Sequence, residues 1–119
     1  AVATPELRAL VGRLAEEYHL PLEASGVRHL GGWSGAERSA EQKTQALVAL
    51  LEGLGSGDWL IIEHPGADTP EMRALGHPGY ENVAADRAGV TAAFTSDAVR
   101  AVIARRGIEL IAYRDLAVR

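Results

Sequence analysis

GDWLIIEHPG, residues 57–66, is the stretch on which the fold prediction depends. Its four large apolar residues, from Trp59 to Ile62, stand between a Gly-Asp pair and a Pro-Gly pair. A short apolar run with turn signals at both ends is typical of a strand buried on both faces, as in a parallel sheet covered by helices. This assignment puts His64 at the carboxyl end of the strand, and that edge is where α/β sheets and βα barrels bind ligands.

Helices and weaker strands flank this central strand. Helical spacing of apolar residues and capping residues predict helices over residues 5–19, 40–54, 82–94 and 97–106, with one helical turn within 71–75. Residues 22–28 and 108–113 are predicted as further strands, and residues 65–80 form a long connection. Strands that alternate with helices indicate an α/β fold with a parallel sheet.

Three strands are few for such a sheet and would leave its edges unpaired. We therefore expect the chain to be the carboxyl-terminal portion of a larger α/β sheet or βα barrel, with the missing strands upstream of Ala1. We expect residues 1–119 to form one α/β segment of that larger domain.

The composition excludes several classes of function. The formal net charge is −4 and no basic stripe is present, which argues against nucleic acid as a partner. The chain has no cysteine, so thiolate catalysis and cysteine-based zinc sites are excluded. No apolar run is long enough to cross a membrane, and no charged-then-apolar leader opens the chain, so we expect a cytoplasmic protein without a membrane partner.

Residues 29–35, HLGGWSG, form a glycine-rich loop that carries Trp33. The loop lacks the Gly-Lys-Ser/Thr ending of a phosphate-binding loop. Two interpretations remain open: a mobile rim over a pocket, or a plain surface connection.

Several stretches, in this order and spacing, resemble the carboxyl-terminal part of the YdjC-like (ChbG/HpnK) carbohydrate deacetylases. The matching residues are 14–18 (LAEEY), 20–22 (LPL), 57–66 (GDWLIIEHPG), 70–74 (PEMRA), 80–82 (YEN), 85–86 (AD), 94–96 (FTS), 107–111 (GIELI) and 113–116 (YRDL).

The resemblance implies a metal-dependent hydrolase on a distorted βα barrel that removes acetyl groups from N-acetylated sugars. In that family an early Asp and two His hold a divalent metal, Mg or Zn, and those motifs would lie upstream of this chain. Of the family's motif residues only the His of His-Pro-Gly has a counterpart here, His64. The chain departs from the family at Glu63, where a small or apolar residue is common, and at Glu23, where an Arg is expected.

Amide hydrolysis needs a proton for the departing amine, and histidine suits this step because its ordinary pKa is about 6.5. We expect His64 to be the general acid or to orient the intermediate. The alternative is a strand-terminal histidine whose ring is hydrogen-bonded to nearby backbone.

Two further residues are candidates for contact with the acetylated sugar. Asp68 could orient His64 or bind a sugar hydroxyl, although it also suits a turn. Trp33 could stack on a sugar face or could be a half-buried loop anchor. His64, Asp68 and His77 could alternatively hold a metal together.

The possible protein partners are a second copy of the chain or the missing amino-terminal part. The runner-up interpretation is a non-catalytic α/β module whose exposed sheet edge pairs with a partner chain or a second copy.

Overall fold

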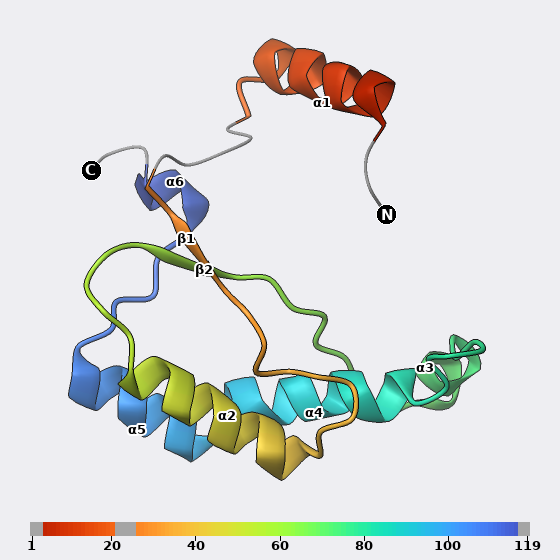
Figure 1. Ribbon diagram of the computed structural model, residues 1–119, viewed down its shortest axis with the longest axis vertical. Coiled ribbons are helices and arrows are strands. Elements are labelled where there is room, and N and C mark those ends of the chain that lie inside the picture. The colour runs from red at the N-terminus through yellow and green to blue at the C-terminus, as the bar shows by residue number, and fades with distance from the viewer. Residues whose placement is uncertain (1–3, 21–25, 117–119) are drawn as a thin grey trace. The chain divides into compact units, whose positions relative to one another are not determined.

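The computed structural model describes residues 4–20 and 26–116 and divides the chain into two compact units (Figure 1). One unit comprises Ala1–Gly26 with Ile111–Arg119, and the other is Val27–Leu110. The first contains the helices α1 (Pro5–Glu17) and α6 (Tyr113–Leu116). The second contains β1 (Arg28–Leu30), α2 (Ala40–Glu52), β2 (Trp59–Ile61), α3 (Pro70–Ala74), α4 (Val83–Thr95) and α5 (Asp97–Arg106).

Local sequence signals explain where the helices begin and end. The Thr4 hydroxyl caps α1 by accepting from the amide of Leu7 at 3.3 Å. Ser39 and Gln42 form the predicted capping box at the start of α2. Gly107 follows α5 with φ +63°, the left-handed conformation that glycine adopts without a Cβ penalty. All five predicted helical segments are therefore confirmed, with shifts of a few residues at their ends.

The sheet has two parallel strands among the described residues, and Arg28 pairs with Trp59, His29 with Leu60 and Leu30 with Ile61. The strand predicted over residues 22–28 lies partly outside the described residues, and β1 begins at its last position.

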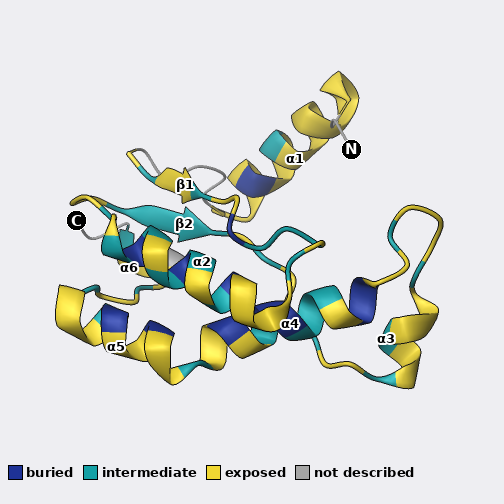
Figure 2. Ribbon diagram, turned by 60° about the horizontal axis from the view of Figure 1, so that its bottom comes forward, coloured by how far each residue is buried: buried dark blue, intermediate teal, exposed yellow. Residues whose placement is uncertain are grey.

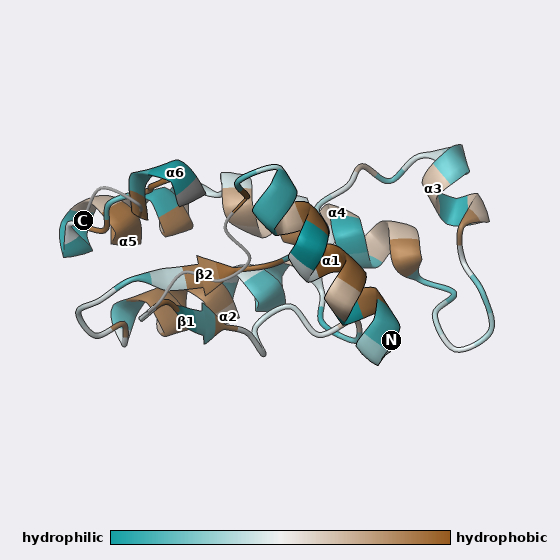
Figure 3. Ribbon diagram, turned by 90° about the horizontal axis from the view of Figure 1, so that it is seen from above, coloured by the Kyte–Doolittle hydropathy of each residue, from teal (hydrophilic) through white to brown (hydrophobic). Residues whose placement is uncertain are grey.

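β2 is hydrophobic along its length (Figure 3). Ile61 packs against the helical core, but every residue of β2 is only half-buried and Ile62 is 63% exposed. The expected burial of the strand on both faces is thus not met, because the helices of its unit lie along one side of the sheet (Figure 1).

A layer of three helices, α2, α4 and α5, contains the hydrophobic core. Figure 2 shows their buried residues on the sides where the helices face one another. The core comprises Trp33, Leu47, Leu51, Val90, Ala93, Val99 and Val102. No helix within residues 4–20 and 26–116 is both long and apolar enough to cross a membrane.

The prediction of a strand over residues 108–113 was wrong. Residues 108–112 are irregular and are followed by α6. The Ile108 amide instead donates to Ile103 O at 3.0 Å and closes the end of α5, while the Ile108 side chain packs against the core. A strand needs a ladder partner, and the apolar pattern alone cannot supply one. The fold class is therefore mixed α/β, and the residues that the structure describes do not form a barrel.

Candidate functional site

Both strands run toward the end of the helical layer at which α2 and α4 begin (Figure 1). We call this end the carboxyl edge; it comprises the loops 31–39, 62–69 and 75–82. Side chains tie these loops to one another and to the helices. Ser34 donates a hydrogen bond to Glu63, and the Asn82 amide donates to Ala36 O at 2.7 Å. The edge is therefore a connected assembly of loops.

His64 lies at this edge, in the segment that follows β2. Its side chain is exposed, and in the described part of the chain no hydrogen bond to its ring is found. The alternative of a ring bonded to nearby backbone is thus not what the structure contains. Glu63, by contrast, is half-buried and holds the Ser34 hydroxyl. An accessible imidazole next to an anchored residue is able to exchange a proton with a ligand.

Asp68 lies further along the same loop and binds an arginine. Its carboxylate accepts from Arg73 Nε at 2.6 Å and from Arg73 Nη2 at 3.1 Å. The hydrogen bond from Arg73 holds the pKa of Asp68 below its ordinary value. Both carboxylate oxygens face the guanidinium, so nothing in this geometry supports an orienting contact to His64.

Trp33 is a core residue, with 2% of its surface exposed. Its ring packs against Phe94 of α4, with the centroids 5.3 Å apart and the planes tilted by 55°. Arg38 donates to the carbonyls of Gly32 and Trp33 at 2.9 and 2.8 Å, which anchors the glycine-rich loop. The ring thus offers no face to a sugar, and the loop-anchor alternative describes its contacts better.

The sequence interpretation missed a buried charged network beneath the edge. Lys43 of α2 is fully buried, at 0% exposure, and its ammonium donates to the carboxylate of Asp86 and, at 3.0 Å, to Asp86 O. The second Asp86 oxygen accepts from the Tyr80 hydroxyl. A Cβ at Gly89 would lie 3.2 Å from Lys43 Cδ, so α2 and α4 approach closely around the lysine stem. We call the fully buried Lys43, together with its half-buried partners Asp86 and Tyr80, the buried triad.

One sequence signal could have revealed the triad. Lys43 is the only lysine of the chain, and it stands one helical turn before Leu47 on the apolar stripe of α2. A cation on a core-facing stripe predicts a buried partner.

Opposing effects act on the ionisation of the triad. Burial of the Asp86 carboxylate works to raise its pKa, but the hydrogen bonds from Lys43 and Tyr80 outweigh burial, so the pKa of Asp86 lies below its ordinary value. The hydrogen bond to Asp86, with burial added, raises the pKa of the Tyr80 hydroxyl. Near neutral pH the triad therefore holds a carboxylate and a protonated phenol.

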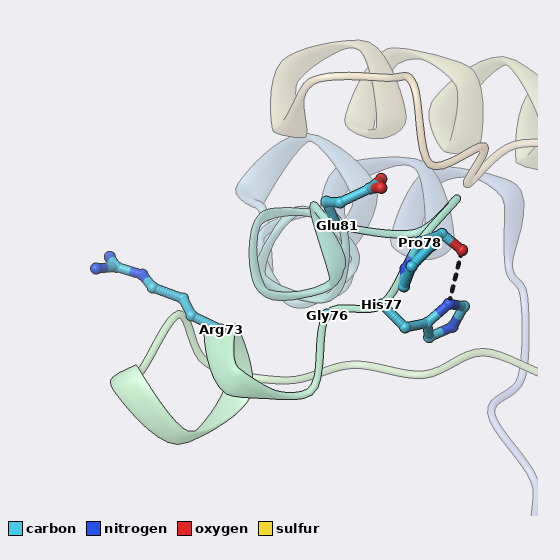
Figure 4. Close-up of a pocket in the computed structure, with 5 residues that line it drawn as sticks. All are labelled: Arg73, Gly76, His77, Pro78 and Glu81. Carbon is cyan, nitrogen blue, oxygen red and sulfur yellow. Dashed lines mark hydrogen bonds between the residues drawn. The ribbon is translucent and has the colours of Figure 1, made fainter.

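His77, the third candidate metal ligand, lies at a pocket of about 330 Å³ lined by Arg73, Gly76, His77, Pro78 and Glu81 (Figure 4). Its Nδ1 lies 3.1 Å from Pro78 O, and the side chains of Arg73 and Glu81 extend in different directions. Among residues 4–20 and 26–116, no three His, Asp or Glu side chains form a group that could hold a metal. The alternative metal site of His64, Asp68 and His77 is therefore not formed.

Comparisons with protein-family models, with curated proteins and with solved structures found no match to this chain.

Proposed function

We propose that this chain is the carboxyl-terminal portion of a metal-dependent hydrolase that removes acetyl groups from N-acetylated sugars in the cytoplasm, with His64 as the proton donor. The observation that carries the proposal is the accessible imidazole on an anchored segment at the carboxyl edge. The sequence resemblance to the YdjC-like carbohydrate deacetylases supplies the reaction class.

The step assigned to this chain is proton transfer. As the C–N bond of the tetrahedral intermediate breaks, the protonated His64 ring gives its proton to the amine nitrogen, so the deacetylated amino sugar leaves and the acyl part becomes acetate. The described residues contain no set that fits a divalent metal, so no step is assigned to a metal held by this chain.

Two His-Pro-Gly tripeptides in the chain provide a matched experiment. In the complete natural protein, His64→Ala is expected to lower kcat for release of acetate from N-acetylglucosamine by about 10²- to 10⁴-fold, the usual contribution of a general acid. His77→Ala changes the same residue type in the second tripeptide and is expected to leave kcat within about twofold. Equal turnover by His64→Ala and the wild-type protein would remove His64 from the reaction.

One observation favours a second candidate function. The described sheet has only two strands of three residues each, and so small a sheet leaves backbone groups on its outer edges available for pairing. A non-catalytic module would use such an edge to bind a partner strand or a second copy of the chain. Light scattering that finds a stable dimer, together with no acetate release by the complete protein, would favour this function over the hydrolase.

A further inference from the structure

The His64 ring has no hydrogen-bonded neighbour of its own among the described residues, so its position depends on the backbone that carries it. On the strand side, Glu63 holds the Ser34 hydroxyl. On the other side Pro65 restricts the backbone through its ring, and Gly66 follows. What fixes Gly66 therefore helps to fix His64.

Gly66 is bound by the side chain of Thr91 in α4. The Gly66 amide donates to Thr91 Oγ1 at 2.9 Å, and the Thr91 hydroxyl donates to Gly66 O at 2.7 Å. One hydroxyl thus satisfies both backbone groups of the same residue. The Gly66 amide also lies 3.2 Å from Arg87 O, so it is shared between two acceptors of α4.

This use of a hydroxyl differs from the common behaviour of threonine within a helix. The hydroxyl of a helical threonine usually donates a hydrogen bond to a backbone carbonyl in the preceding turn. Thr95, one turn further along α4, does this: its Oγ1 donates to Thr91 O at 2.9 Å. Thr91 lies 3.2 Å from the equivalent carbonyl, Arg87 O, but its shorter contacts are to Gly66.

Close packing also holds Gly66 against α4. A Cβ at Gly66 would lie 3.2 Å from Arg87 Cβ and 3.2 Å from Met72 Cε. The segment after His64 therefore lies against α4 at a distance that only glycine allows without a shift of its neighbours.

We propose that Thr91 is a positioning residue for His64: through Gly66 it fixes to α4 the short segment that presents the imidazole. The catalytic part of this inference rests on the function proposed above, whereas the mechanical part does not. A proton donor must be held close to the productive geometry, and supporting contacts of this kind hold it there.

The experiment compares Thr91→Val, Thr91→Ser and Thr95→Val. Valine keeps the shape of threonine without its hydroxyl, and serine keeps the hydroxyl. In this chain, Thr91→Val is expected to accelerate hydrogen exchange of the Gly66 amide by about fivefold or more, the effect of losing one net hydrogen bond. The backbone order of His64, measured by ¹⁵N relaxation, falls with it. Thr91→Ser restores both properties, and Thr95→Val leaves both at wild-type values.

In the complete natural protein, Thr91→Val is expected to lower kcat for acetate release from N-acetylglucosamine by about 10- to 100-fold with KM little changed. Thr91→Ser is expected to recover most of this loss.

The possible outcomes separate the contact between Thr91 and Gly66 from the catalytic role of His64. If Thr91→Val leaves the hydrogen-exchange rate of the Gly66 amide and the backbone order of His64 at wild-type values, Thr91 does not hold this segment. The same conclusion follows if Thr95→Val changes both properties as much as Thr91→Val does. A loosened segment with unchanged kcat would overturn the positioning role in an active enzyme. A wild-type protein that releases no acetate would overturn the proposed function and the catalytic role together, while the exchange data would still decide the attachment.

Discussion

Replacing Lys43 with Met tests the buried triad most directly. Methionine keeps an unbranched stem in the space beside Gly89 but removes the charge and the hydrogen bonds that the ammonium donates to Asp86. The Asp86 carboxylate then loses its cation while its side chain stays only 13% exposed. Breaking a buried ion pair by removing one partner costs about 3–5 kcal/mol. The Tyr80 hydroxyl still donates to Asp86, so we expect a loss of about 3 kcal/mol, near the lower limit.

Urea unfolding followed by tryptophan fluorescence, to which the core residue Trp33 and the strand residue Trp59 both contribute, measures this loss. With a urea dependence of about 1–3 kcal/mol per M, the midpoint is expected to fall by about 1–3 M. Arg100→Met is the matched control, because Arg100 forms an exposed pair with Asp97 and its loss should cost at most about 1 kcal/mol.

A double-mutant cycle with Asp86→Asn isolates the pair. Each single variant leaves one buried partner uncompensated, so the double variant is expected to be more stable than the sum of the single losses predicts, by up to about 3 kcal/mol. The triad is not an energetically coupled unit if the free energy of unfolding of Lys43→Met lies within about 1 kcal/mol of the wild-type value. The same holds if the losses of the two single variants simply add in the double variant.

Three further predictions concern acid stability and the ends of helices. Because the folded pKa of Asp86 lies below its ordinary value of about 3.9, its contribution is complete above that value and is lost as the pH falls through the folded pKa. The fall in unfolding free energy below about pH 4 should therefore be shallower in Asp86→Asn, and an identical acid profile would contradict this assignment. Gly107→Ala places a side chain at φ +63° and should cost about 1 kcal/mol in the free energy of unfolding, whereas an unchanged melting temperature would count against a left-handed cap. Ser39→Ala removes the capping box of α2 and should cost about 1 kcal/mol by urea unfolding, with Ser56→Ala, in an exposed bend, as a neutral control.

The sequence predicted the features that neighbouring residues determine. The capping box at Ser39 and the glycine stop at Gly107 use contacts within a few residues, so their signals are complete in a short stretch of sequence. The strand over residues 108–113 could not be judged in this way, because a strand exists only where a second strand pairs with it.

The same distinction between local and long-range contacts applies to the candidate site. The apolar run and the Pro-Gly after it predicted His64 at the carboxyl end of the strand; the edge is right, but β2 ends earlier, at Ile61, and His64 lies in the loop that follows. The burial of Trp33 depends on Phe94 of a distant helix, and the ion pair of Lys43 joins residues separated by 43 positions. Such contacts follow from how the helices pack, which periodicity within one helix does not specify.

The complete burial of Lys43 also determines how the folded protein behaves toward lysine-directed chemistry. The chain has no second lysine, so reagents that acylate ε-amino groups find no such group at the surface of the described residues, and trypsin has no accessible lysyl bond there. Acylation at this position requires the α2–α4 contact to open. The rate at which the Lys43 ε-amino group is acylated therefore reports how often the contact between α2 and α4 opens.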